Sequence, residues 1–317
     1  MIKKIFKWTG ITVLTLVVLV ALVTTLMFHR TYNAPYPNIK ASKDSAVIAR
    51  GKHLVQGPAH CADCHSTAKS KGSLTAAAGD APLSGGFKFE FPLGRFYTPN
   101  LTPDPETGLG RFTDGEIART LRYGVKRNGE SAIPFMPFQN LSDEDLTAIV
   151  SYLRTLQPVR NAVPEHSYSL MGTIVKAFLL KPEGPQAKPP ASVQKDTSAA
   201  YGQYIVSSVA NCSGCHTRRD DMGKPVGAPL AGGVVFEEAG FPTLVTPNLT
   251  QHPSGRLWHW TEADFIKRFR MGRVIKHSHM PWESYKNMSD DELKAIFNYL
   301  KSIKPAPTEK VAVKGKA

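Results

Sequence analysis

The sequence has 317 residues, with 39 lysines and arginines against 26 acidic residues, and a formal net charge of +13. Its length corresponds to about two domains, and 42% apolar with 9% aromatic residues excludes a wholly disordered chain. Four cysteines are too few for a disulfide-dense scaffold. Over half of the charge excess lies in two tails: three lysines in the first seven residues, and five lysines with one glutamate in the last seventeen. The charge therefore predicts no nucleic-acid-binding face.

An uncharged run from Thr9 to Phe28 follows the first tail. Twenty helical residues rise about 30 Å, the thickness of a bilayer hydrocarbon core. A cleaved signal peptide is the alternative, but its apolar core has only ~7–15 residues before a small-residue cleavage site. Lysines before the span predict a cytoplasmic N-terminus. We therefore expect a cytoplasmic basic tail at 1–7, a single-pass transmembrane anchor at 8–28, and the rest of the chain outside the cytoplasm.

The sequence after the anchor repeats itself at an offset of 147–151 residues. A repeat of that size indicates a duplicated domain rather than a solenoid. The matched segments are Gly51-Lys-His-Leu-Val with Gly202-Gln-Tyr-Ile-Val, Cys61-Ala-Asp-Cys-His with Cys212-Ser-Gly-Cys-His, and Thr-Pro-Asn-Leu-Thr at 98–102 and 246–250. We expect a linker at 29–44, domains at 45–157 and 196–303, a Pro-rich linker with a short helix at 158–195, and a basic C-terminal tail at 304–317.

Both domains are predicted to be mainly helical. One apolar face recurs at helical spacing near the end of each repeat, formed by Leu146, Ile149, Val150 and Leu153 and by Leu293, Ile296, Phe297 and Leu300. Capping signatures precede four predicted helices, at Thr113, Ser142, Thr261 and Ser289. The Gly- and Pro-rich stretch 66–112 is expected to form ordered loops. The apolar stretch 170–180 is too short to span a bilayer, and we expect a short helix packed between the domains, with membrane contact as the weaker alternative.

All four cysteines fall in two C-x-x-C-H motifs, one with Cys61, Cys64 and His65, and one with Cys212, Cys215 and His216. This spacing is typical of covalent c-type haem attachment, in which two thiols on one helical turn bind the haem vinyl groups and the histidine ligates the iron. A thioredoxin-like dithiol needs no histidine, a shared zinc site would have to join two domains, and a structural disulfide is the remaining alternative. Two complete copies favour two covalently bound haem c groups.

Methionine is a common second axial ligand of such haems, and it raises the reduction potential. The first repeat contains a single methionine, Met136, and it aligns with Met280 of the second; proline follows each. Proline fixes φ and removes a donor, so the loop can hold the thioether rigidly. We predict Met136 and Met280 as iron ligands, with His277 or His279 as the alternative in the second repeat.

Other polar residues near the repeated loops could hydrogen-bond the haem propionates, since arginine pairs with carboxylates and Tyr, Asn and Trp donate single hydrogen bonds. An ordinary structural contact is the alternative for each. The histidines without a repeated partner are expected to be surface or packing residues. The propionate candidates are Arg95, Tyr97, Asn100, Arg111, Asn248, Arg256, Trp258 and Trp260.

With these motifs, the sequence resembles a membrane-anchored bacterial dihaem cytochrome c. The stretch that starts at Tyr97 and reads Tyr-Thr-Pro-Asn-Leu-Thr-Pro-Asp-Pro-Glu-Thr-Gly-Leu-Gly-Arg-Phe-Thr-Asp is similar to the cytochrome c subunits of membrane-bound alcohol and gluconate dehydrogenases. Those subunits carry three c-type domains, whereas this chain has two haem motifs. The resemblance implies tandem cytochrome c domains, His65/Met136 and His216/Met280 ligation, and electron transfer.

The expected function is single-electron transfer between redox partners on the periplasmic side of a bacterial cytoplasmic membrane. We expect an electron carrier rather than an enzyme, working with redox proteins or as a subunit of a membrane dehydrogenase, oxidase or other respiratory complex. The alternative is a dihaem redox enzyme of the peroxidase or thiosulfate dehydrogenase type. Such an enzyme needs an open iron position, and two matched methionine loops argue against one.

Overall fold

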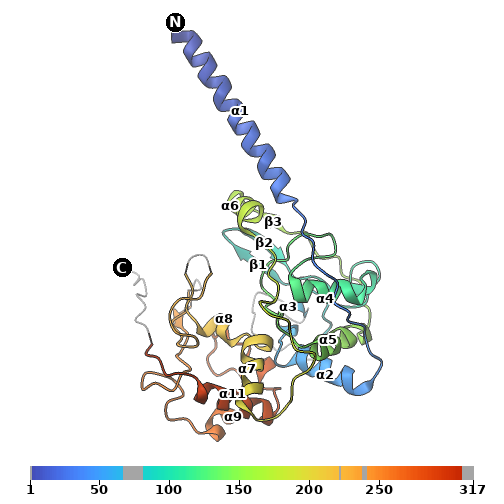
Figure 1. The fold of residues 1–317 in the computed structure, drawn as a ribbon, viewed down its shortest axis with the longest axis vertical. Helices are drawn as coiled ribbons and strands as arrows, with labels where there is room; N and C mark the ends of the chain where they lie inside the picture. The colour runs from blue at the N-terminus through green and yellow to red at the C-terminus, as the bar shows by residue number, and fades with distance from the viewer. Residues whose placement is uncertain (1, 67–80, 221–222, 238–240, 309–317) are drawn as a thin grey trace.

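The computed structural model describes residues 2–66, 81–220, 223–237 and 241–308. Its first helix, α1 (Ile2–Phe28), extends away from the rest of the chain, and none of its residues is buried (Figure 1). Its length and apolar composition fit a single-pass membrane anchor. The helix begins before the predicted span, because the three lysines also adopt helical conformation.

The first domain is mainly helical, as predicted. Its elements are α2 (Ser45–Gln56), α3 (Ala62–His65), the 3₁₀ turn η1 (Leu109–Arg111), α4 (Asp114–Tyr123) and α5 (Asp143–Thr155), with strands β1 (Lys88–Phe91) and β2 (Gly94–Tyr97). Helix α4 starts with the expected capping box between Thr113 and Glu116, and it ends at Gly124 in a left-handed conformation. Ser142 caps α5 by accepting from the backbone of Asp145. These local signals therefore predicted the helix ends correctly.

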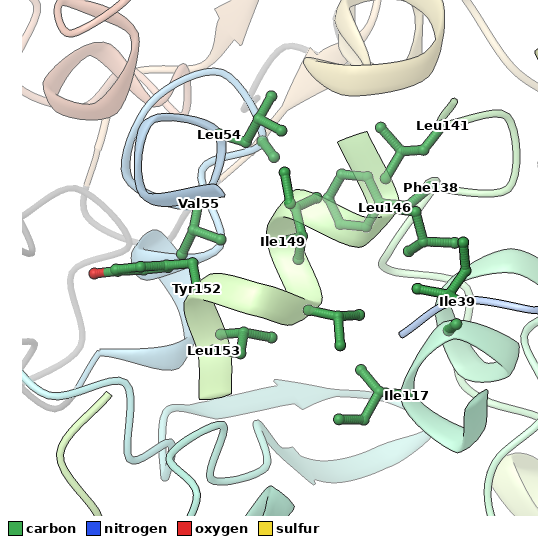
Figure 2. Close-up of a cluster of buried hydrophobic side chains, with 14 of the residues drawn as sticks. Ile39, Leu54, Val55, Ile117, Phe138, Leu141, Leu146, Ile149, Tyr152 and Leu153 are labelled. Carbon is green, nitrogen blue, oxygen red and sulfur yellow. The ribbon is translucent and has the colours of Figure 1, made fainter. Parts of the chain in front are cut away.

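Helices α2 and α5 cross at Gly51. A Cβ atom at that position would lie 1.9 Å from the carbonyl oxygen of Ala148, so the close approach requires glycine. The predicted apolar face of α5 is buried here, with Leu146 and Ile149 packed against Leu54 of α2 in the cluster drawn in Figure 2. The second domain repeats this crossing: a Cβ atom at Gly202 would lie 1.9 Å from the carbonyl oxygen of Ala295.

A small antiparallel sheet lies where the sequence predicted only loops. Strand β1 pairs with β2 with Lys88 opposite Tyr97 and Phe91 opposite Gly94, and β3 (Ser167–Tyr168) adds to the other edge of β2. The expectation of loops throughout 66–112 was therefore wrong for 88–97; its residues 67–80 lie outside the described residues. Phe89 stacks on Phe91 and meets Phe87 edge-on along this hairpin. The Gly and Pro content of the stretch did not indicate this aromatic packing.

The apolar stretch between the domains forms α6 (Leu170–Ile174) and a π-helical turn, η2 (Val175–Leu179). We expected this stretch to pack between the two domains, but it does not. It packs beside the end of α1, where Phe28 and Tyr168 meet with ring centroids 5.2 Å apart. Figure 1 shows α6 at the foot of α1. The prediction was wrong because the partner of this stretch is the anchor helix, far away in the sequence.

The second domain repeats the first with α7 (Ala199–Tyr204), the π-helical turn η3 (Ile205–Val209), α8 (Cys212–His216), α9 (Glu262–Arg270), α10 (Trp282–Tyr285) and α11 (Asp290–Ser302), and strands β4 (Val235–Phe236) and β5 (Leu244–Val245). Capping boxes start α9 at Thr261 and α11 at Ser289. The predicted face of α11 is buried, with Leu293 and Ile296 in its core. The second repeat has eight residues between Met280 and Ser289, three more than the first, and they include α10.

A buried ionic cluster joins the domains. Arg50 donates from Nε and Nη2 to the two carboxylate oxygens of Asp145 (2.9 and 3.0 Å), and from Nη1 to Glu292 of the second domain (3.0 Å). His53 Nε2 lies 2.7 Å from the other oxygen of Glu292, and the hydroxyl of Tyr204 donates to Asp145 (2.9 Å). The side chains of Asp145 and Glu292 are 0% and 5% exposed and occupy the same position in α5 and α11. Asp145 and Glu292 therefore each accept a hydrogen bond from a side chain of the other domain.

Candidate functional site

The two C-x-x-C-H motifs form matching helical turns. Backbone bonds from Cys64 and His65 to the carbonyl of Cys61 close the first turn (3.2 and 2.9 Å), and α8 contains the second. The residue before each turn, His60 or Asn211, has a left-handed backbone (φ 40° and 50°), which His and Asn adopt more readily than most residues. All four cysteines lie in the part of the chain that the structure describes, and no disulfide joins the two cysteines of either motif.

The two motif histidines are held in one tautomer. Nδ1 of His65 lies 2.9 Å from the carbonyl oxygen of Pro99, and Nδ1 of His216 lies 3.0 Å from that of Pro247. Only a protonated Nδ1 can donate to a carbonyl, which leaves the lone pair on Nε2 for a metal. Burial lowers the pKa of both imidazoles, although the bonds to Pro99 and Pro247 oppose that effect. A neutral, oriented imidazole is the form that ligates iron, so these residues fit a haem.

In each domain a glycine packs closely between the motif histidine and the proline whose carbonyl faces it. Gly85 donates its N–H to the carbonyl of His65 (2.8 Å), and Gly232 donates to that of His216 (2.7 Å). Both glycines have positive φ, and a Cβ atom would lie about 2.5 Å from the backbone at Pro99 or Pro247, so no larger residue fits. Sequence reasoning noticed the exact Thr-Pro-Asn-Leu-Thr repeat but missed that its proline carbonyl orients the ligand.

The predicted methionine ligands lie on the same cores as the first cysteines. Met136 and Cys61 both pack against the core of the first domain, and Met280 and Cys212 against that of the second. The loop at Met280 is fixed by its neighbours: its N–H donates to the hydroxyl of Ser278 (3.3 Å), and its carbonyl accepts from Trp282 (2.8 Å).

The rival ligands in the second repeat have aromatic partners. The ring of His279 stacks on Phe236, with centroids 4.7 Å apart, and that of His277 contacts Phe241 at 4.2 Å. These contacts account for both histidines as packing residues. The comparison therefore favours Met280 as the ligand.

Two of the propionate candidates have structural roles. The amide of Asn100 donates to the carbonyl of Val159 (2.8 Å) and accepts from Thr102 (2.9 Å), while that of Asn248 donates to the carbonyl of Ala306 (2.7 Å) and accepts from Thr250 (2.8 Å). Both side chains are buried and fix the loops that carry Pro99 and Pro247. Of the remaining candidates, Arg95 and Tyr97 belong to strand β2 and Arg111 to the turn η1, while Arg256, Trp258 and Trp260 follow Asn248 in the second domain.

The attachment segments of the two domains touch each other through α10. Ser284 donates its hydroxyl to Asp63, inside the first motif (2.9 Å), and both side chains are buried. The ring of Tyr285 meets that of His60 edge-on, with centroids 5.5 Å apart, and its hydroxyl donates to the carbonyl of Ala210 (2.6 Å). His60 directly precedes Cys61, and Ala210 lies two residues before Cys212. The sequence analysis missed this contact between the two motifs. The only signal for it was the three extra residues of the second repeat, in the segment that contains α10.

Comparison with known proteins gives two matches to one family model, described as cytochrome c, over residues 48–157 and 199–304. The alcohol dehydrogenase (quinone) cytochrome c subunit of Gluconobacter oxydans is 31% identical over 84% of this chain and 57% of its own length. The gluconate 2-dehydrogenase cytochrome c subunit of Pantoea cypripedii is 27% identical, over 82% and 60%. A diheme cytochrome c-type protein of Cereibacter sphaeroides is 24% identical, over 77% and 81%. The chain thus spans a little over half the length of the dehydrogenase subunits.

Proposed function

The chain belongs to the cytochrome c family and carries two covalently bound haem c groups, and we propose that it transfers single electrons between redox partners at a membrane surface. The observation that carries this proposal is the duplicated site, in which each domain places two cysteines on one helical turn beside a buried imidazole held by a backbone carbonyl. When bound, each haem supplies a one-electron ferric/ferrous couple. The matching family regions support domains at 45–157 and 196–303.

We assign attachment to the motif cysteines, and His65 with Met136 and His216 with Met280 would hold the two irons. The carbonyls of Pro99 and Pro247 orient the imidazoles, and the buried cores exclude water from them. Two protein ligands on each iron would leave no open position for a substrate, which favours a carrier over the peroxidase or thiosulfate dehydrogenase type. Attachment involves Cys61, Cys64, Cys212 and Cys215.

The orientation in the membrane follows from the charges beside α1. Lys3, Lys4 and Lys7 precede the apolar run, and positive charges concentrate on the cytoplasmic side of membrane spans. The haem domains then face the periplasm of a bacterium. The names of the relatives support a partner in a membrane dehydrogenase or a larger respiratory complex.

Replacing Met136 by His tests the ligand assignment. Met136→His is expected to keep the haem attached but to lower the potential of that site by on the order of 0.1 V or more, within the ~0.8 V range that axial ligands span. A redox titration followed by visible and near-infrared spectra measures it. Met280→His should lower the other potential in the same way, whereas Met171→His on α6 should change neither. An unmoved potential in Met136→His would show that another residue is the ligand.

The contacts that α10 makes with both attachment segments predict a short path for electrons between the two haem sites. Tyr285→Ala removes the ring that contacts His60 and the hydroxyl bonded to Ala210. We expect it to slow electron exchange between the sites, because the electronic coupling between them weakens as close atomic contacts are lost. Pulse radiolysis in a Met136→His background, where the potentials differ, measures this rate.

Two variants make that experiment specific. Tyr285→Phe keeps the ring contact and loses only the hydroxyl, so its rate should lie between those of the parent and Tyr285→Ala. Phe91→Ala removes an exposed aromatic ring on β1 and should leave the rate unchanged. If Tyr285→Ala exchanges electrons at the parent rate with unchanged potentials, the electrons use another route.

A further inference from the structure

An apolar surface lies at the foot of α1. Five large apolar side chains of the segment 170–179 are exposed, from Leu170 at 80% and Met171 at 60% to Phe178 at 41%. Leaving such side chains in water costs about 25 cal/mol for each Å² that could be buried. The set is Leu170, Met171, Ile174, Phe178 and Leu179.

The segment 170–179 is fastened to the end of the anchor. The ammonium of Lys176 lies 3.8 Å from the ring centroid of Phe28, the last residue of α1. Just beyond the helix, Tyr32 donates its hydroxyl to the carbonyl of Leu180 (3.0 Å) and accepts from Nε of Arg30 (2.9 Å). The segment therefore keeps a fixed position beside the point where the anchor leaves the membrane.

The one charge of this segment is turned inward. Lys176 is only 10% exposed and pairs with Glu130 (3.3 Å), which also pairs with Lys126 (3.7 Å). The outward surface thus carries no ionic group. Ten residues cannot cross a bilayer as a helix, but a helix with one apolar face can lie in the interface, buried ≈ 5–10 Å into the boundary between headgroups and acyl chains.

We propose that the segment 170–179 lies in the interface of the bilayer that α1 crosses, with its five exposed apolar side chains inserted among the lipids. Because Thr9–Phe28 is long enough to span the hydrocarbon core, Phe28 sits at its edge, and the segment touching Phe28 lies at the same depth. The first domain is then held to the membrane at two places, and its orientation is fixed rather than set by a flexible tether. This proposal depends on α1 being the anchor, but not on the haem ligands.

Lipid cross-linking tests the proposal in the haem-loaded full chain. Leu170→Cys and Leu179→Cys are each coupled to a benzophenone maleimide, reconstituted in nanodiscs of phosphatidylethanolamine and phosphatidylglycerol, and irradiated. Intact mass should show lipid adducts at both positions. Val245→Cys and Val274→Cys, exposed valines of the second domain, should give none, and the unsubstituted protein measures any background from the native cysteines.

A cysteine inside the anchor separates the possible outcomes. Leu19→Cys in α1 should give lipid adducts whether or not the segment touches lipid. Adducts at Leu19→Cys without adducts at Leu170→Cys and Leu179→Cys would overturn the proposal and leave the surface for a protein partner. An independent readout is the reaction of the uncoupled cysteines with a membrane-impermeant maleimide, which should be at least tenfold slower at the two segment positions than at Val245→Cys; equal rates would also overturn it.

Discussion

The double variant Cys61→Ser, Cys64→Ser is expected to mature with one covalently bound haem per chain instead of two. Serine hydroxyls do not form the thioether bonds that two thiols on one turn provide, and Cys61 also packs against the core of the first domain. A pyridine haemochrome assay and the intact mass of the purified chain measure the loss. The first domain should also lose stability, because the apolar haem would no longer contribute buried surface beside Cys61 and Met136, which pack against its core.

Matched variants show whether the two sites are equivalent. Cys212→Ser with Cys215→Ser should also halve the haem content, and all four substitutions together should abolish it. His259→Ala, on the exposed surface of the second domain, should retain both haems. Full haem content in either double variant would contradict the attachment assignment.

Replacing Arg50 by Met is expected to destabilise the folded chain by about 3–5 kcal/mol, the usual cost of removing one partner from a buried ion pair. Arg50 serves two carboxylates. Without it, Asp145 keeps the hydroxyl of Tyr204, and Glu292 keeps His53, the hydroxyl of Tyr201 and the backbone N–H of Ser289, but neither keeps its guanidinium partner. Guanidinium unfolding of the detergent-solubilised protein, followed by far-ultraviolet circular dichroism, measures the change. Arg160→Met is the matched control, because its pair with Glu106 is exposed (71% and 59%) and should be worth under about 1 kcal/mol.

The effect of Arg50→Met should also depend on pH. Burial raises the pKa of Glu292, but the hydrogen bond and charge of His53, the backbone N–H of Ser289 and the charge of Arg50 together outweigh it and lower that pKa to about 2. In the unfolded chain a glutamate titrates at ~4.3. The free energy that ionised Glu292 contributes to folding is therefore complete above that pH and is lost as the pH falls towards 2. The difference between parent and variant should therefore shrink in that range; a difference that is constant from pH 7 to pH 3 would exclude Glu292 as its source.

The helices were predictable because their signals are local. Thr113 and Ser289 cap the helices that follow them, and the periodic face that begins at Leu146 is buried as its spacing indicates. The duplicated C-x-x-C-H motif, with the family it indicates, was equally readable, because both cysteines and the histidine lie on one turn. The pairing of Met136 with its haem stays a prediction.

The remaining features depend on contacts between distant residues. Strand β2 forms because β1 and β3 flank it, and β3 follows it by some 70 residues. Asp145 and Glu292 looked like ordinary helix-start residues, and His53 like a surface histidine, because their partners belong to the other domain. The prediction for the stretch 170–179 was wrong for the same reason. Nothing near it in the sequence indicates that it packs against the end of α1.

The cluster around Arg50 has a consequence for attempts to divide the protein. Duplication gave both halves an acidic residue at the third position of the last helix, and each now depends on a donor from the other half. A fragment cut at the proline-rich linker would uncover one of these carboxylates and the apolar surface around it. The two halves are thus no longer interchangeable modules, and an isolated single-haem fragment should be a poor stand-in for the same domain in the intact chain.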